Sequence, residues 1–314
     1  MTTHILKYHM INLKKTSFSH HRDGWNSATK ELIKIHDNNG VMFFDWADWE
    51  LKFKVKFDFK WSGILHNVLN YPIDYPRKYG EKRLLSLTSL VKDESFKNNM
   101  KNCKGLFTLC KHTCDFIKTN VDVPVDWIWH PIDEVDKKFD FSLFEQDPKI
   151  YMIGQWLRKF HSFFELRTSI KKMMPKISGF EEDYIDAINY SVPKDVNMIN
   201  YMSNQDYDNA LSSSIVFIDL YDSAACNTVI ECIIRNTPLL VNPLPAVVQY
   251  LGEDYPFYFK SLEEASEKSV NFELIKETSC YLQKSDKEKF RSENFLESFV
   301  NSKVYKKIAV RIFN

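Results

Sequence analysis

Hydrophobic and polar positions along the chain follow two different periods in turn. Short runs rich in β-branched and aromatic residues, such as VMFFDW at 41–46, GLFTLC at 105–110 and SIVFIDLY at 214–221, alternate with longer stretches of helical period. This alternation predicts βαβ units with parallel strands. We therefore expect an α/β fold. One stretch, KVKFDFKW at 54–61, instead alternates apolar with charged residues.

The pattern stops once and then restarts. The segment DEVDKKFDFSLFEQDP (133–148) is polar, has no regular period and ends in proline, and KIYMIGQW (149–156) then predicts a new strand and turn. A chain of 314 residues also favours two domains, at roughly 150 residues per domain. We expect residues 1–147 to form the first α/β domain and 148–314 the second, which ends in charged, amphipathic terminal helices.

Composition narrows the class of protein. Hydrophobic residues make up 44% of the chain, enough for a large core, and 42 basic residues balance 42 acidic ones. That balance argues against a nucleic-acid binder, which needs a net positive surface. Six cysteines are ordinary usage for a reducing compartment, and no stretch approaches the roughly 20 apolar residues of a membrane span. We expect a soluble cytoplasmic protein.

The first candidate for chemistry is IGQWLRKF, at the end of a predicted strand. Gly154 closes the strand, and Arg158 and Lys159 follow directly. Ligands of open parallel sheets bind outside the carboxyl ends of the strands. Two cations there can neutralise a diphosphate, with arginine as a forked donor. The alternative is a solvated surface pair, which is common for these residue types.

The second candidate is DSAACNT, where the strand SIVFIDLY turns into a helix. Ser223 and Ala224 are small and precede Asn227 and Thr228, so a phosphate could approach the free backbone N–H groups of the helix start. The alternative is an ordinary N-cap by Asp222 or Ser223.

The third candidate is Glu231, a single carboxylate in the apolar run VIECII. Asn227, Glu231 and Arg235 follow at i, i+4 spacing, which is typical of a solvated surface pair. A carboxylate at that depth in the helix can also accept both hydroxyls of a ribose, because it offers two acceptor oxygens.

The segment 223–252, with NTVIECIIRNTPLLVNPLPAVVQYLG, resembles the donor-binding segment of GT-B fold glycosyltransferases of the large retaining family, group 1. The resemblance implies two Rossmann-like domains facing a central cleft. It implies that Glu231 binds the nucleotide ribose and that Arg158 and Lys159 bind the donor diphosphate. WSGILHN resembles the segment whose histidine, here His66, faces the transferred sugar. HRDGWN resembles the loop near the donor phosphates, with Gly24 as its close-contact residue.

The chain departs from the family at one position. The family commonly has a first Glu eight positions before the ribose Glu, near the sugar, and this chain has Ser223 there. Either the sugar is contacted differently or the neighbouring Asp222 substitutes for that Glu.

The resemblance implies transfer of a sugar from a UDP- or GDP-linked donor to a carbohydrate or other hydroxyl acceptor, without a metal ion. A nucleotide-sugar epimerase on the same fold would need further acid–base residues. A catalytically idle nucleotide-sugar-binding module is the third interpretation, and Ser223 keeps it open.

Other constellations are weaker. The cysteines and histidine between 103 and 114 match no zinc-ligand spacing, and the chain has no G-x-S-x-G elbow, Walker loop or dinucleotide glycine fingerprint. His20 and His21 could supply a general base or be exposed loop residues. The aspartates and tryptophan of FDWADWE (44–50) could contact a sugar acceptor or simply end a strand.

Overall fold

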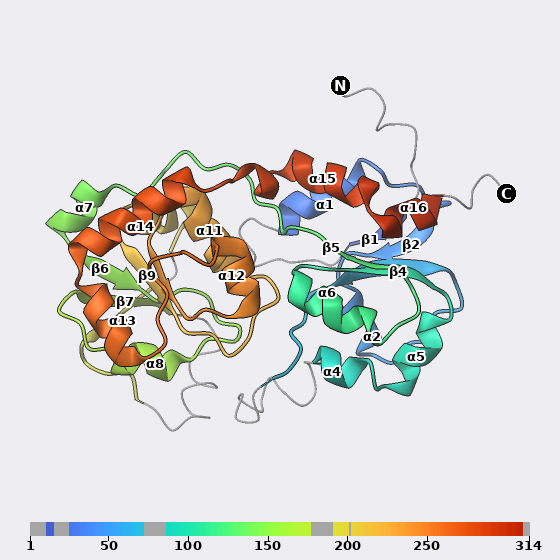
Figure 1. Ribbon diagram of the computed structural model, residues 1–314, viewed down its shortest axis with the longest axis horizontal. Helices are drawn as coiled ribbons and strands as arrows, with labels where there is room; N and C mark the ends of the chain where they lie inside the picture. Colours follow the sequence, from blue (N-terminus) through green and yellow to red (C-terminus); the bar gives the residue numbers. More distant parts are fainter. Residues whose placement is uncertain (1–10, 16–24, 72–85, 177–190, 201, 310–314) are drawn as a thin grey trace. The chain divides into compact units, whose positions relative to one another are not determined.

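Contacts between residues divide the chain into two units, each built on its own sheet. The computed structural model describes residues 11–15, 25–71, 86–176, 191–200 and 202–309. The first unit comprises Met1–Asn70, Arg83–Asp133 and Glu288–Asn314, and the second comprises Tyr71–Lys82 and Glu134–Lys287. This division differs from the expected boundary after residue 147, chiefly because the C-terminal helices join the first unit (Figure 1).

The first unit contains a parallel five-stranded sheet whose strands lie in chain order. The strands are β1 Ile11–Lys14, β2 Val41–Phe44, β3 Trp61–Leu65, β4 Cys103–Thr108 and β5 Val125–Trp127. The helices are α1 Trp25–Ile33, α2 Ala47–Leu51, α4 Leu87–Leu90, α5 Glu94–Met100, α6 Lys111–Lys118, η2 Glu288–Phe290, α15 Ser292–Asn301 and α16 Lys303–Ala309.

Neighbouring residues of these strands pack on opposite faces of the sheet. Phe43 meets Phe299 of α15 with ring centroids 5.2 Å apart, whereas Phe44 stacks on Phe57 at 4.9 Å and meets Trp61 at 6.0 Å. Figure 1 shows α15 and α16 over one face and α2, α4, α5 and α6 over the other. A parallel sheet covered on both faces explains the nearly continuous hydrophobic runs in the sequence.

One glycine explains why α16 can lie against the sheet. Gly105 of β4 has φ +153°, and a Cβ there would lie 2.8 Å from Val304 Cγ1 and 2.9 Å from the Pro124 carbonyl oxygen. Asp126 accepts hydrogen bonds from the backbone N–H groups of Lys303 at 2.7 Å and of Val304 at 3.4 Å. The C-terminal helix is therefore anchored to β4 and β5.

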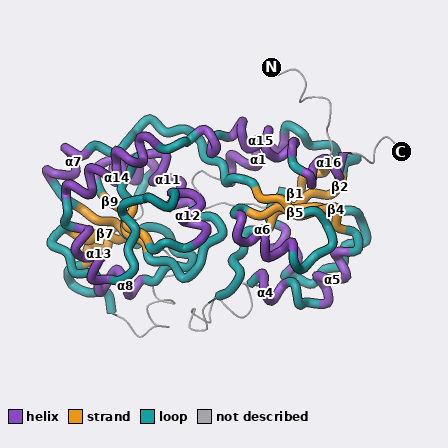
Figure 2. Tube along the Cα trace, viewed as in Figure 1, coloured by secondary structure: helices purple, strands orange, loops and turns teal. Residues whose placement is uncertain are grey.

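The second unit contains a parallel sheet of order β10-β9-β6-β7-β8. Counted along the chain from the β8 edge, this is the order 3-2-1-4-5 of doubly wound folds. Figure 2 shows the strands of each unit as a separate set enclosed by helices. The strands are β6 Lys149–Tyr151, β7 Lys171–Pro175, β8 Val196–Ile199, β9 Ile215–Ile218 and β10 Leu239–Val241; the helices are α7 Phe141–Gln146, α8 Phe160–Glu165, α10 Asn204–Ser213, α11 Asn227–Arg235, α12 Pro245–Leu251, α13 Leu262–Ser269 and α14 Phe272–Lys284.

The prediction of an α/β fold with two parallel sheets and C-terminal helices is confirmed, but two local predictions are wrong. The polar segment before residue 148, which has no regular period, contains the helix α7. The pattern of SFFELRTSIKKMM (162–174) predicts a single helix, but the structure has the end of α8 followed by β7 there. Lys172 explains the second error. It is buried in β7, where its ammonium group donates to three carbonyls at the end of α8 and pairs with Asp195 at 2.7 Å. A cation near a helix C-terminus is favourable, but its burial cannot be read from the period.

Substitution of Gly105 by alanine tests the anchoring of α16. We expect Gly105→Ala to lower the free energy of unfolding by about 2–4 kcal/mol, because the new Cβ meets two atoms and the backbone angle is strained for an L residue. Urea unfolding followed by circular dichroism measures the loss. Gly105→Ala should lower the free energy of unfolding by less in a Val304→Ala background, because one of the two obstructing side chains or carbonyls is then gone. An equal loss in both backgrounds would contradict this packing.

Candidate functional site

The strand order of the second unit reverses between β6 and β9, and the segments that follow these two strands are joined directly. Arg158 and Leu220 form an isolated antiparallel bridge, and the Lys159 N–H donates to the Asp219 carbonyl at 2.8 Å. Ligands of doubly wound sheets bind at this reversal point, outside the carboxyl ends of the strands. The structure therefore brings together the first two candidate stretches of the sequence.

Arg158 is the centre of this junction. Its side chain is buried, and its guanidinium donates to the carbonyls of Ile153 at 3.2 Å and Trp156 at 2.9 Å, and to Cys226 Sγ at 3.2 Å and Thr228 Oγ1 at 3.0 Å. These bonds engage four of the five N–H groups of a guanidinium. The interpretation of Arg158 as part of a solvated surface pair is wrong, since it fastens the turn after β6 to the start of α11.

Gly154 makes room for that guanidinium. Its φ is +82°, and a Cβ at this position would lie 2.7 Å from Arg158 Nη2. Leu157, in the same turn, also has a positive φ of +60°, which is uncommon for a branched residue. The turn IGQWLR is thus shaped around the arginine.

Lys159 is paired within the protein. Its ammonium group lies 3.0 Å from Asp219 Oδ1, and Ser162 donates to the other carboxylate oxygen at 2.7 Å. Asp219 is buried, whereas the Lys159 side chain is 28% exposed. Lys159 can therefore exchange part of this contact for a ligand anion without becoming buried and uncompensated.

The helix α11 begins without the predicted side-chain cap. Cys226, rather than Asp222 or Ser223, is its N-cap residue, and in the described part of the chain its side chain makes no capping hydrogen bond. The Asp222 carboxylate instead accepts the N–H of Ser223 at 2.7 Å. The first-turn amides, from Asn227 onward, make this helix start suited to an anion.

Glu231 is buried on α11, so the alternative of a solvated pair with Arg235 is wrong. The Glu231 side chain is 6% exposed and accepts a hydrogen bond from the Tyr207 hydroxyl of α10. Arg235 is fully buried and forms its ion pair with Asp208, at 2.7 Å. Tyr207 was not identified from the sequence, since the region before SIVFIDLY has no clear period.

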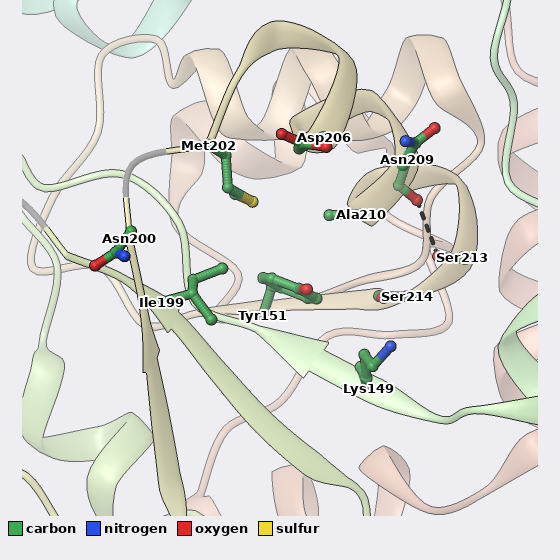
Figure 3. Close-up of a pocket in the computed structure, with 10 residues that line it drawn as sticks. All are labelled: Lys149, Tyr151, Ile199, Asn200, Met202, Asp206, Asn209, Ala210, Ser213 and Ser214. Atoms are coloured by element: carbon green, nitrogen blue, oxygen red, sulfur yellow. Dashed lines mark hydrogen bonds between the residues drawn. The ribbon is translucent and has the colours of Figure 1, made fainter.

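A pocket of about 380 Å³ also lies in the second unit, against β6, the end of β8 and α10 (Figure 3). Tyr151 lies on its sheet side, and Asp206 and Asn209 line it from α10. None of the site residues predicted from the sequence lines this pocket. The site is therefore defined by the strand ends and by α11.

In the first unit, His66 follows β3 and is held on several sides. Its Nε2 lies 2.8 Å from the Asp45 carbonyl oxygen, so this nitrogen carries the proton. The ring meets Trp25 edge-on, with centroids 4.3 Å apart. Asp48 accepts the N–H groups of His66 at 2.9 Å and Asn67 at 2.8 Å.

Both aspartates of FDWADWE are therefore structural. Asp45 and Asp48 are fully buried, which makes acceptor contact by their side chains wrong. Burial raises the pKa of Asp48 to about 6, although the hydrogen bonds from His66 and Asn67 act in the opposite direction.

Several predictions lie outside what these residues can test. Gly24, His20 and His21 fall outside the described residues. Within the described part, no three His, Cys, Asp or Glu side chains gather as metal ligands would. No described helix has the length and apolar character needed to cross a membrane.

Solved structures with the same architecture include a glycosyltransferase from Rickettsia africae, which matches with a TM-score of 0.53 at 13% identity over 95% of this chain and 85% of its own. TarM matches with a TM-score of 0.63 at 13% identity over 85% of this chain and 54% of its own. Sucrose-phosphate synthase from Thermosynechococcus elongatus matches at 0.60 and 11% identity over 82% and 71%. HepE from Anabaena, crystallised with UDP and glucose, matches at 0.60 and 10% identity over 88% and 79%.

The chain has the GT-B fold. At these low identities the likeness establishes the fold, and the chain spans only about half the length of the TarM chain. No protein-family model and no curated protein sequence matches it significantly. The two sheets and the C-terminal helices agree with the GT-B expectation drawn from the sequence.

The pKa of Asp48 predicts an unusual pH dependence for this GT-B protein. The folded state holds the proton more tightly than the unfolded chain, so Asp48 loses its stabilising contribution as pH rises from about 4 through about 6. Asp48→Asn does not titrate. Relative to it, the wild type should lose about 3 kcal/mol of unfolding free energy between these limits.

Urea unfolding of both proteins across this pH range measures the difference. Asp58→Asn, at an exposed position, is the control and should show no such trend. A constant difference between wild type and Asp48→Asn would show that Asp48 is ionised throughout.

Proposed function

We propose that this protein is a glycosyltransferase that takes its sugar from a nucleotide-diphosphate donor bound by the second unit. The observation that carries the proposal is the junction of Arg158 with the start of α11, at the reversal point of the sheet. The buried carboxylate of Glu231 lies further along the same helix. The GT-B fold supports this choice of reaction.

The diphosphate would lie at the start of α11. The first-turn amides donate hydrogen bonds, and the guanidinium of Arg158 adds positive potential to that of the helix end. Because Arg158 already bonds four protein groups, its contribution is mainly its charge and the placement of the amides. Charge that develops on the departing diphosphate would be stabilised by groups that need no rearrangement.

The ribose would be held by Glu231. The Tyr207 hydroxyl fixes the carboxylate from α10 and uses one of its roughly four acceptor positions. Two vicinal hydroxyls can donate to a carboxylate, because it offers two acceptor oxygens. Such anchoring of the nucleoside aims the anomeric carbon toward the acceptor. His66, Asp222 and Gly24 enter as sugar and phosphate contacts from the sequence resemblance, and the reaction needs no metal ion in this scheme.

Ser223 supports a second candidate, a nucleotide-sugar-binding module without turnover. It stands where the resembled family has its first Glu, and it is buried with a hydroxyl in place of a carboxylate. An assay of nucleotide release distinguishes the glycosyltransferase from the binding module. The protein is incubated with a panel of UDP- and GDP-sugars and mixed hydroxyl acceptors. Tight donor binding without release would favour the module.

The role of Glu231 predicts a dependence on the ribose hydroxyls. We expect Glu231→Gln to weaken UDP or GDP binding about 10- to 100-fold, because two charge-assisted hydrogen bonds lose strength. Isothermal titration calorimetry measures the affinity. The nucleotide, UDP or GDP, that raises the melting temperature more shows which base the protein binds. For the matching 2′,3′-dideoxynucleotide, wild type and variant should bind alike.

Glu277→Gln, on an exposed face of α14, serves as the matched control. An equal loss for the nucleotide and its dideoxy analogue would show that Glu231 does not contact the ribose.

The role of Arg158 predicts a dependence on the phosphates. Arg158→Gln should lower the affinity for the nucleoside diphosphate at least about tenfold and leave the nucleoside affinity unchanged, because the lost charge faces the phosphates. Arg167→Gln, at an exposed position, is the control. Equal weakening of diphosphate and nucleoside would instead assign Arg158 a purely structural role.

A further inference from the structure

The connection between α2 and β3 in the first unit exposes an unusual concentration of apolar side chains. Phe53 is 59% exposed, Val55 51% and Phe59 44%. They are three of six large hydrophobic residues exposed among the described residues, yet they lie within seven positions of one another. Scattered single exposed residues need no explanation, whereas a cluster does.

The cluster is held in place by the protein rather than loosely attached. Phe57, between the exposed residues, is buried and stacks on Phe44. Asn99 of α5 accepts the Phe57 N–H at 2.9 Å and donates to the Val55 carbonyl at 2.8 Å. Asn102 donates to the Phe57 carbonyl at 2.9 Å. Since the backbone is fixed on both sides of Phe57, the exposed neighbours cannot simply turn inward.

The same segment is strongly basic. Between residues 52 and 60 it carries Lys52, Lys54, Lys56 and Lys60 against the single acid Asp58, a net charge of +3 in a chain of net charge zero. The side chains of Lys54 and Lys56 are 71% and 79% exposed. Lys56 pairs with the exposed Asp58 at 2.7 Å, an ion pair that contributes little to stability. Lys54 pairs at 3.4 Å with Asp93, whose side chain is 21% exposed.

Trp49 and Phe53 extend the aromatic part of this surface. Their rings meet at 5.9 Å, and the Lys52 ammonium group lies 2.9 Å from the Trp49 ring centroid. Aromatic rings interleaved with lysines are typical of surfaces that rest at the boundary between lipid headgroups and acyl chains.

We propose that residues 52–60 form a docking surface for an anionic lipid bilayer. Phe53, Val55 and Phe59 would enter the headgroup boundary, and the four lysines would contact acidic headgroups. Phe53 and Val55 are more than half exposed, so they stand out from the surface rather than line a groove and suit insertion into a deformable layer better than receipt of a partner's side chains. The surface involves no residue of the proposed donor site.

Co-sedimentation of the full chain with vesicles tests the proposal. The wild type should sediment with phosphatidylcholine vesicles that contain about a third phosphatidylserine, and not with phosphatidylcholine alone; high salt should release it. Lys54→Gln with Lys56→Gln should weaken binding by about 25-fold, at about fivefold per lysine. Phe53→Ser with Phe59→Ser should weaken it as strongly.

Two control variants alter matched exposed positions in the second unit: Lys276→Gln with Lys284→Gln, and Leu143→Ser. Both should sediment as the wild type does, and unchanged melting temperatures check that all variants fold. Absence of sedimentation with anionic vesicles, equal binding to neutral vesicles, or full binding by either surface variant would overturn the proposal. A dimer in solution that Phe53→Ser dissociates would show instead that a second copy covers this surface.

Discussion

The buried guanidinium of Arg158 is the interaction on which the candidate site depends. It connects the turn after one central strand with the first residues of the helix after the other, so two segments about seventy residues apart behave as one structure. The connection requires Gly154, because any side chain there would occupy the place of the guanidinium. It also places a full positive charge beside the positive end of a helix. Such an arrangement is costly in isolation and favourable once an anion is bound, which supports the proposed binding site.

Two buried carboxylates, Asp48 and the proposed ribose ligand Glu231, are held by different kinds of hydrogen-bond donor. Asp48 accepts backbone N–H groups of His66 and Asn67, which ties its helix to the chain after β3. Glu231 is held by the side chain of Tyr207, and it lies on the helix that starts at the sheet's reversal point. In sequence Glu231 is a single acid in an apolar run, whereas Asp48 stands near Asp45 and Glu50, and neither pattern shows what the acid does. Only their hydrogen-bond donors separate them, and donors of this kind are set by tertiary structure.

The sequence predicts the strand ends and their small residues, where the pattern is local, but it does not predict features that depend on tertiary packing. The strand, glycine and arginine of IGQWLR and the small residues before α11 are read directly, since close backbone approach requires them. The helix predicted over 162–174 is wrong because Lys172, although charged, is buried in a strand, where carbonyls at the end of α8 accept its hydrogen bonds. The return of α16 to the first sheet depends on a glycine in β4 some two hundred residues earlier. Tyr207 could be recognised only once α10 was seen to lie against α11.

A GT-B fold at 10–13% identity to solved structures is physically reasonable, because the fold constrains far fewer positions than the sequence contains. Parallel sheets need apolar residues of suitable volume on both faces, and many sequences supply them. The features that distinguish this chain lie at positions where this packing requirement does not fix the residue type. Ser223 lies in the connection between β9 and α11, Tyr207 lies on a helix that packs against another helix, and residues 52–60 lie in the connection before β3. Because the scaffold would tolerate other residues at these places, their chemistry is the best guide to what distinguishes this protein within the fold.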